Sequence, residues 1–348
     1  MKEIHITSKE EGQRMDKILG KYLNQAPASF LYKMLRKKNI KLNGKKADGK
    51  EKLKDGDIIT LYLADDTIDK FQKTEAFPIT NKENPGSEHV IGARTRKNRK
   101  IEESVGTCEL PEIIFENEHI LFMNKPAGIL SQKASKNDIS INEQMIAYCL
   151  EKGLVTEEEL KIRKPSVTNR LDRNTTGIIA AGISIKGLTF LSELFRNRNL
   201  EKYYFTIVKG KMTQPAALKG YLKKDNRTNQ VTVKSKKENK DDSYIETIYE
   251  PIRYTEQYTL LKVRLVTGKP HQIRAHLAFI GHPILGDEKY GDHKLNLYWK
   301  KEAGLTCQLL HSGILIFPEL TGEWQSLSGR RFEAPKPKQF LQIEQKIF

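Results

Sequence analysis

One long stretch without hydrophobic periodicity, residues 64–109, limits how this chain can fold more than any other feature. It is rich in charged residues, Pro, Asn and Ser, and a segment of this length without periodicity is typical of a linker or a disordered insertion. For its basic run, residues 94–100, a solvated charged surface is a commoner outcome than contact with phosphates. We therefore predict two folded domains, residues 1–63 and 111–348, joined by a charged, flexible linker over residues 64–110.

The chain is strongly basic, with 60 Lys and Arg against 44 Asp and Glu and a net charge of +16. Such an excess raises the rate of association with nucleic acid and supplies non-specific affinity through counterion release. An anionic membrane surface is the competing partner, but the sequence has no amphipathic anchor and no apolar run of roughly 18 residues. We therefore expect a nucleic-acid partner and no membrane association.

Cysteine usage and the amino terminus favour a cytoplasmic protein. Cys108, Cys149 and Cys307 are widely separated, odd in number and without the spacing of a zinc site, so we expect reduced thiols and no metal. Residues 1–13 lack the apolar region of a signal peptide. No feature indicates an obligate protein partner, and we expect a monomer.

Residues 1–63 have the pattern of a small basic domain with two helices and a hairpin. Apolar residues recur at helical spacing over 15–23, and Ser29 is expected to cap a second helix that ends in the basic triplet 36–38. The domain holds 15 Lys and Arg against 8 Asp and Glu, nearly half of the net charge. Basic residues at a helix end complement the helix dipole, but this does not account for the lysines that follow. Those are Lys41, Lys45, Lys46, Lys50, Lys52 and Lys54.

This first domain resembles the S-four-like RNA-binding domain, a module that bacterial RNA-modifying enzymes and a ribosomal protein share. The resemblance rests on residues 14–17 at the start of helix one, on the basic end of helix two, and on the Ile-Lys-Leu-Asn-Gly-Lys turn at 40–45. It implies that basic side chains at these three places bind RNA. The residues concerned are Arg14, Arg36, Lys37, Lys38, Lys41 and Lys45.

Strand patterns dominate the second domain. Strands are expected at residues 113–115, 120–123, 203–208, 230–233, 244–249, 258–266 and 309–317. Helices are expected at residues 141–150, 188–195 and 273–279. Runs of strands interrupted by a few helices predict an α+β fold with a mainly antiparallel, mixed sheet, preceded by the small α/β domain.

The segment 167–180 sets one carboxylate, Asp172, between Arg170 and Arg173. The apolar residues after Gly177 predict a buried strand, so the Arg-Leu-Asp-Arg segment is expected to be a tight loop held against a sheet. Neighbouring cations favour the ionised form of a carboxylate, and an ionised, positioned carboxylate suits a nucleophile or a base. A salt-bridged surface turn is the alternative that this segment leaves open.

A second informative segment covers residues 267–287. On a helix that starts after Pro270, His271 and Arg274 share a face, which can direct a guanidinium and an imidazole toward one site. A metal site is not indicated, because His271 and His276 diverge on a helix and no other ligand completes a set. Taken alone, each histidine is more simply explained by structural hydrogen bonding.

Together these segments resemble the RluA-type family of RNA pseudouridine synthases. Asp172 lies in a match to the family's His-Arg-Leu-Asp-x-x-Thr-Ser-Gly motif, and residues 267–287 match its second motif. Further matches, all in the family's order, are residues 120–128, residues 202–210 and Leu310-His311 before the last strand. The chain departs from the family at Asn169, where His is frequent, and at Lys269-Pro270, where Arg-Thr is usual.

The resemblance implies that uridine is converted to pseudouridine by breaking the N1–C1′ bond, rotating the uracil and joining its C5 to C1′. This needs no metal or cofactor, because no redox change occurs and no atom is lost. Asp172 would attack C1′ or manage a cation-like or glycal intermediate, paired with Arg274. Tyr204 would stack on the flipped uracil and assist removal of the C5 proton. Arg170 would help to hold the RNA with its target nucleotide swung out.

We therefore predict an RNA pseudouridine synthase that acts on large-subunit ribosomal RNA, because a separate basic domain suits a large folded RNA. The same enzyme class acting on tRNA is one alternative. A second is a ribosome-assembly factor that binds RNA but has lost its catalytic activity. A third is a nucleoside hydrolase or glycosidase, although a glycoside hydrolase uses a second carboxylic acid that these motifs lack.

Overall fold

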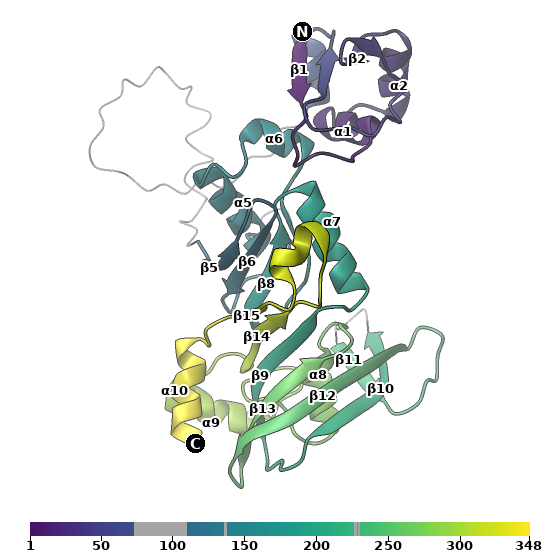
Figure 1. Cartoon of the computed structure of the whole chain (residues 1–348). Helices are drawn as coiled ribbons and strands as arrows, with labels where there is room; N and C mark the ends of the chain where they lie inside the picture. Colours follow the sequence, from purple (N-terminus) through teal and green to yellow (C-terminus); the bar gives the residue numbers. More distant parts are fainter. Residues whose placement is uncertain (73–109, 136–137, 226–227, 229) are drawn as a thin grey trace, which may run out of the picture.

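The computed structural model of the chain contains two separate β-sheets (Figure 1). It describes residues 1–72, 110–135, 138–225, 228 and 230–348. The linker expected at 64–110 therefore lies largely outside the described residues, as does its basic run. Among the helices in the described ranges, none has both the length and the apolar character needed to cross a membrane.

The first sheet and three helices form a small unit at the amino-terminal end. Its elements are β1 (Lys2–His5), α1 (Met15–Tyr22), α2 (Ala28–Arg36), β2 (Ile40–Leu42), β3 (Lys45–Lys46), β4 (Ile58–Leu61) and α3 (Asp65–Phe71). The strands pair antiparallel in the order β1-β4-β2-β3. Both predicted helices and the Asn43-Gly44 hairpin turn are confirmed, and both turn residues have the positive φ that such a turn requires. The expected cap at Ser29 is wrong, because Pro27 occupies the N-cap position.

Helix α3 lies inside the stretch that we expected to be linker. Its Ile68 side chain is buried in the core of the first unit, and Phe71 packs on Phe30 with ring centroids 4.6 Å apart. Acidic residues mask this helix in the sequence, since Asp65 and Asp66 fill its first turn. We therefore propose that the first domain extends to Phe71 rather than ending at residue 63.

The second sheet has eleven strands in the order β11-β10-β12-β13-β9-β14-β8-β6-β5, with β15 on β14 and β7 on β8. Its strands are β5 (Glu112–Glu116), β6 (Ile120–Lys125), β7 (Ser166–Val167), β8 (Thr176–Gly182), β9 (Glu201–Lys209), β10 (Ala216–Asp225), β11 (Gln230–Lys234), β12 (Ser243–Tyr254), β13 (Tyr258–Leu265), β14 (Leu310–Ile316) and β15 (Arg331–Glu333). All neighbours are antiparallel except β8 and β14, which are parallel. The predicted α+β class with a mainly antiparallel sheet is confirmed.

Helices cover both faces of this sheet (Figure 1). They are α5 (Ile141–Glu151), α6 (Glu157–Ile162), α7 (Ile185–Arg196), α8 (Gln272–Phe279), α9 (His293–Ala303), α10 (Lys338–Ile347) and the short 3-10 helix η1 (Gly322–Leu327). Successive residues of a strand point to opposite faces. In β6, Leu121 and Met123 share a cluster with α5, while Ile120 and Phe122 share one with α7. This two-sided burial explains why the predicted strands β6 and β8 are continuous apolar runs.

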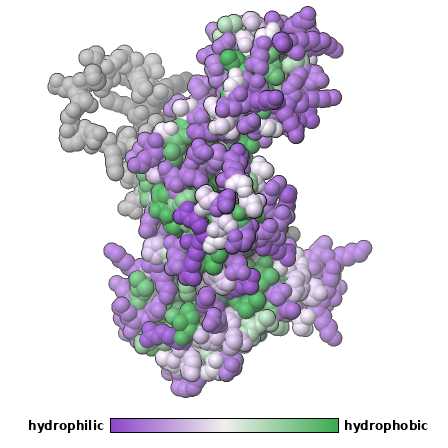
Figure 2. Space-filling view, viewed as in Figure 1, coloured by the Kyte–Doolittle hydropathy of each residue, from purple (hydrophilic) through white to green (hydrophobic). Residues whose placement is uncertain are grey.

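The first unit is docked on α6, beside α1 in Figure 1. Ile162 of α6 is buried in the core of the first unit, and Lys9 Nζ donates to the carbonyl of Leu154 at 2.9 Å. A salt bridge between Glu10 and Arg163 is almost completely buried, with both side chains only 2% exposed. The exposed surface of the unit is mainly hydrophilic (Figure 2). The two units therefore share packing contacts as well as a covalent connection.

Candidate active site

The loop that carries Asp172 connects β7 to β8 and is held from both sides by hydrogen bonds. Ser131 Oγ accepts from the backbone N–H of Leu171 and donates to its carbonyl, both at 2.9 Å. Immediately after Asp172, the carbonyl of Arg173 accepts from Lys125 Nζ at 2.8 Å. The backbone is thereby fixed on both sides of the carboxylate, as expected for a tight loop against a sheet.

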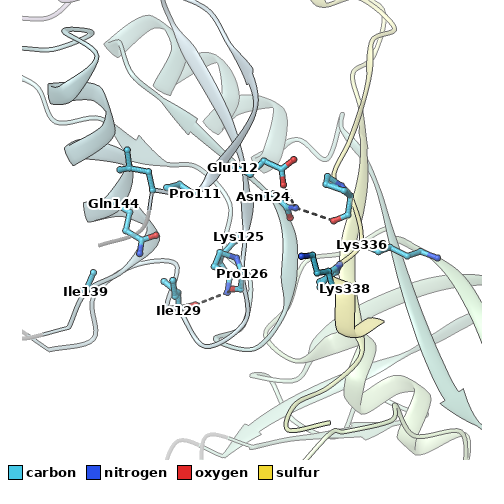
Figure 3. A pocket seen from close by; sticks show the side chains of 13 residues that line it. Pro111, Glu112, Asn124, Lys125, Pro126, Ile129, Ile139, Gln144, Lys336 and Lys338 are labelled. Atoms are coloured by element: carbon cyan, nitrogen blue, oxygen red, sulfur yellow. Dashed lines mark hydrogen bonds between the residues drawn. The ribbon is translucent and has the colours of Figure 1, made fainter. Parts of the chain in front are cut away.

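Lys125, at the end of β6, is the buried anchor of this loop. Its ammonium donates to the carbonyls of Pro126, Ile129 and Arg173 at 2.7–2.9 Å. Lys125, Pro126 and Ile129 are labelled in Figure 3. Burial lowers the pKa of Lys125 to about 7, against the opposing effect of the negative charge of Asp172. These three contacts give Lys125 a structural role.

Asn169 and Gly177 explain how the loop joins β8. The Asn169 side chain accepts from the N–H of Ala180 at 2.7 Å and donates to the carbonyl of Ile178 at 3.3 Å. Gly177 has φ +106°, and a Cβ there would lie 2.1 Å from the Ser312 carbonyl oxygen. The residue that departs from the family motif is therefore used here to pair with a strand backbone, and the glycine is required by close packing of β14.

Asp172 meets Arg274 of α8, although the two residues are 102 positions apart. Arg274 Nη1 donates to Asp172 Oδ2 at 2.8 Å. The other side of the guanidinium donates to both carboxylate oxygens of Asp287, at 2.7 and 2.8 Å, and Asp287 is fully buried. Burial alone would lower the pKa of Arg274, but hydrogen bonds and charges from Asp287 and Asp172 raise it above its ordinary value. The guanidinium is thus charged and fixed between two carboxylates.

The position of α8 depends on Gln272 at its first turn. Gln272 Nε2 donates to the carbonyl of Glu246 at 2.9 Å and to Thr247 Oγ1 at 3.0 Å, both on β12. Its Oε1 accepts from Thr267 Oγ1 at 2.7 Å and from the N–H of Lys269 at 3.1 Å. These bonds fasten the start of the helix to the sheet and so fix Arg274, two residues further along.

His271 lies just before α8, as its N-cap, with φ 55°, rather than on the helix as expected. Tyr290 Oη accepts from the N–H of Val231 and lies 2.9 Å from His271 Nδ1, and we assign the proton of this second bond to the phenol. His271 Nε2 is then the protonated nitrogen, 4.0 Å from Asp172 Oδ2. Burial lowers the pKa of His271. A neutral imidazole N–H therefore faces the carboxylate.

Tyr204 extends from β9 into the core cluster that also contains Leu171 and Val263. It is 6% exposed, and its phenol pairs with Ser312. Burial, with a contribution from the charge of Asp172, raises the pKa of Tyr204 to about 12. The structure thus brings together three predicted residues from β9, α8 and the loop between β7 and β8.

The flanking arginines do not provide the counterion for Asp172. Arg170 and Arg173 are exposed, and the ion pairs of Asp172 among the described residues are with Arg274 and His271. The expectation that the neighbours in sequence hold this carboxylate is therefore wrong. Arg170 is free of the Asp172 contact and remains a candidate for contacting RNA.

The predicted RNA-binding residues of the first unit lie at the start of α1, at the end of α2 and in the hairpin that follows α2. Arg14 donates to Asp16 from Nε and Nη2, at 3.1 and 2.7 Å. Lys41 lies over the ring of Tyr62, 4.9 Å from its centroid. The remaining basic candidates are exposed, and these are Arg36, Lys37, Lys38 and Lys45. Basic side chains thus concentrate on α2 and the hairpin that follows it.

Asp287, Tyr290 and Ser131 are site residues that the sequence analysis missed. Asp287 is the last residue of the segment 267–287. It could have been expected on physical grounds, because a buried Arg274 requires more negative charge than the partly exposed Asp172 alone provides. Within the described residues, no group of three or more His, Cys, Asp or Glu side chains is arranged to hold a metal ion.

Comparisons with known proteins agree with this arrangement of the site. The profile of a family described as RNA pseudouridylate synthase matches residues 119–279. An uncharacterized RNA pseudouridine synthase of Mycoplasma genitalium is 30% identical over 319 residues, which are 90% of this chain and 88% of that protein. The chain belongs to the RNA pseudouridine synthases. The enzyme is therefore an isomerase, as predicted.

Other RNA pseudouridine synthases match along most of their length. The ribosomal large subunit pseudouridine synthase C of Escherichia coli (strain K12) is 27% identical over 355 residues, covering 100% of this chain and 97% of that one. That of Vibrio parahaemolyticus is 26% identical and covers 93% and 91%. The structure of human RNA Pseudouridylate Synthase Domain Containing 4 shares the fold, with TM-score 0.54 and 20% identity over 68% of this chain and 92% of that one. The RluA-type resemblance is confirmed, while the S-four-like identity of the first unit stays a prediction.

Proposed function

We propose that this RNA pseudouridine synthase modifies uridines of large-subunit ribosomal RNA, with Asp172 as its nucleophile. The names of the relatives that match over the whole chain support the substrate class. The observation that carries the catalytic assignment is the Asp172–Arg274 pair, backed by the fully buried Asp287. A carboxylate that is half exposed while its counterion is buried has one side free for a substrate.

The chemistry requires an oxygen nucleophile at C1′. Asp172 Oδ2 is occupied by Arg274, so Oδ1 is the oxygen available to attack the sugar as the N1–C1′ bond breaks. The uracil leaves as an anion, which neutral N–H and O–H donors stabilise. After rotation of the base, C5 joins C1′ as the bond from C1′ to Asp172 breaks. The C5 proton is then lost to solvent and N1 gains a proton, so Asp172 is released unchanged.

Tyr204 acts as a neutral phenol in this scheme. With its pKa raised to about 12, it is a poor proton acceptor near neutral pH, and its ring is fixed in the core. This favours stacking on the flipped uracil over removal of the C5 proton. The N–H of His271 faces Asp172 and is a suitable donor to the displaced base.

The first unit would hold the RNA while the loop reaches one nucleotide. Its basic residues on α2 and the following hairpin, with Arg170 beside the catalytic loop, would contact phosphates. We propose the division into an RNA-binding domain, residues 1–71, and a catalytic domain, residues 111–348. Fixed contacts through α6 would keep the two at a constant spacing on the RNA.

Asp172→Asn tests the proposal. It should abolish release of tritium from RNA labelled at C5 of uridine, while RNA affinity stays within about threefold, because the amide keeps the shape of the side chain. Asp241→Asn, on an exposed loop, is the matched control and should retain full activity. Turnover by Asp172→Asn would exclude the nucleophile role.

Mapping of pseudouridines identifies the substrate class. RNA from cells with and without the gene should differ at positions in large-subunit ribosomal RNA. A difference confined to tRNA would replace the substrate assignment and leave the enzyme class unchanged. An absence of any difference would favour the assembly factor without catalytic activity.

A further inference from the structure

An open pocket of about 860 Å³ lies beside the catalytic loop, on the other side of Lys125. It forms where the end of β6, the loop that follows it, the first turns of α5 and the segment leading into α10 meet (Figure 3). These segments come from opposite ends of the catalytic domain, and Asn124 Nδ2 joins them by donating to the carbonyl of Pro335 at 3.2 Å. The mechanism described above does not use this pocket.

Apolar residues form two walls of the pocket, and the carboxylate of Glu112 also lines it. Pro126, Ile129 and Ile139 line one side, and Pro335 and Pro337 line the other. Proline rings and branched aliphatic side chains present flat, rigid surfaces without hydrogen-bonding groups. Such walls suit a planar apolar face, for example that of a nucleobase.

Gln144 provides an unpartnered polar group inside this apolar setting. The residue is only 5% exposed, and its Oε1 has no hydrogen-bond partner among the described residues. In Figure 3 its carboxamide points from α5 into the pocket. A buried acceptor without a donor is costly, so a ligand that brings an N–H group would be favoured there. A carboxamide also offers the donor and acceptor pair that reads the edge of a base.

The opposite rim favours an anion. The first backbone N–H groups of α10 have no partner within the helix, and Pro337 at the N-cap has no side-chain acceptor for them. Lys338 lies at the same helix end and lines the pocket. The neighbouring Lys336 is already paired with Glu344 at 2.7 Å. A phosphate group at this rim would meet Lys338 and the helix dipole together.

The pocket also lies close to the reacting centre. Lys125 and Pro126 form part of its wall, and the Lys125 ammonium donates to the carbonyl of Arg173, next to Asp172. Lys125 therefore connects the wall of the pocket directly to the backbone of the catalytic loop. No second copy of the chain or separate partner is needed to bring a ligand there.

We propose that this pocket binds an unstacked nucleotide of the substrate RNA that neighbours the target uridine. Its base lies against Pro126 and Ile129, an N–H on its edge donates to Gln144 Oε1, and its phosphate meets Lys338. This rests on the proposed function, because it requires RNA at Asp172. The pocket would contribute to the choice of site by favouring a base with an amino or imino hydrogen at that position.

Gln144→Leu is the decisive variant. It removes the group that would contact the base and also removes the unsatisfied buried Oε1, so the folded protein should be as stable as wild type or more stable. The KM for a transcribed fragment of large-subunit ribosomal RNA that wild type modifies should rise about tenfold, with kcat within twofold. Gln342→Leu, on the exposed face of α10, is the control and should leave both constants unchanged.

Lys338→Gln tests the anion rim. It should raise KM about threefold and reduce the salt dependence of RNA binding by roughly one phosphate contact. Lys346→Gln, at the other end of the same helix, should do neither. Calorimetry with adenosine 5′-monophosphate tests whether the pocket binds a free nucleotide rather than a nucleotide within RNA. We expect this binding to be too weak to detect below millimolar concentration.

Three results would overturn the proposal. The first is an unchanged KM in both Gln144→Leu and Lys338→Gln. The second is a loss of stability in Gln144→Leu, since this would show that the amide has a structural partner. The third is micromolar binding of the free nucleotide, abolished by Gln144→Leu, with no change in KM for RNA. None coincides with failure of the proposed function, which appears as turnover by Asp172→Asn.

Discussion

Replacing Asp287 with Asn separates the position of Arg274 from the identity of the nucleophile. Asp287 does not reach Asp172, yet both of its oxygens accept from Arg274 and it also accepts from the N–H groups of Lys289 and Tyr290. The carboxamide keeps one acceptor and places an NH2 group against the guanidinium. Arg274 would therefore lose one charged hydrogen bond and face a like-polarity donor in a buried site.

The magnitude follows from these contacts. A hydrogen bond to a charged group contributes about 1.5–3 kcal/mol, and breaking a buried ion pair completely costs about 3–5 kcal/mol. Asp287→Asn leaves part of the pair, so we expect a loss of about 2–3 kcal/mol in the free energy of unfolding. If the same free energy is lost from the transition state because Arg274 shifts away from Asp172, kcat falls by about 30–160-fold, since 1.36 kcal/mol corresponds to tenfold.

Two measurements check this prediction. Urea unfolding gives the free energy of unfolding, and tritium release at saturating RNA gives kcat. Glu288→Gln is the neighbouring control, because Glu288 is exposed and should tolerate the change. A variant Asp287→Asn with wild-type kcat would show that Arg274 needs no second carboxylate, and the positioning argument would fail.

Two further predictions concern stability. Burial lowers the pKa of His276 and His311 to about 4, so between about pH 6.5 and 4 the unfolded chain binds more protons than the folded one. The contribution of each neutral histidine to the free energy of unfolding is complete above about pH 6.5. It is lost as the pH falls through 4, by about 3 kcal/mol for each histidine. Urea unfolding at pH 7 and 4.5 measures the loss, and His311→Gln should reduce it. Glu10→Gln removes the buried carboxylate from Arg163, which keeps its pair with Glu159, and should loosen the first unit on α6, seen as faster proteolysis between the units with unchanged kcat on short RNA. Equal proteolysis rates would contradict the docking.

The sequence predicted those helices and strands whose own pattern of apolar residues shows which face is buried. Strands β6 and β8 are continuous apolar runs, and α5 and α7 have apolar residues at helical spacing, so each was found. Strand β10 was missed because Gly220 and three lysines are unfavourable in strands, and its pairing with β11 and β12 is what holds it. Helix α9 was missed since five of its eleven residues are Lys, Glu or His.

The site was predictable in its members but not in its contacts. Asp172, Arg274 and Tyr204 were chosen because ordered motifs matched a family, and the structure places them together. The sequence neighbours of Asp172 were the wrong counterions, because a loop against a sheet turns adjacent side chains outward while the carboxylate faces the core. Asp287 could not be assigned, since its partner is defined only when α8 and the loop after Ile284 pack together.

The active site also depends on a seam between two halves of the sheet. Asp172 belongs to the half built from β5 to β8, whereas Arg274 and Asp287 follow β13 in the other half. The seam is the short parallel pairing of β8 with β14, where Thr176 Oγ1 lies 2.9 Å from His311 Nδ1 and Gln308 donates to Thr175 at 3.3 Å. Asp172 and Arg274 come from different halves of the sheet, so their ion pair can form only after the two halves have packed together. A mutation at the seam should therefore reduce kcat without touching any residue that meets the substrate.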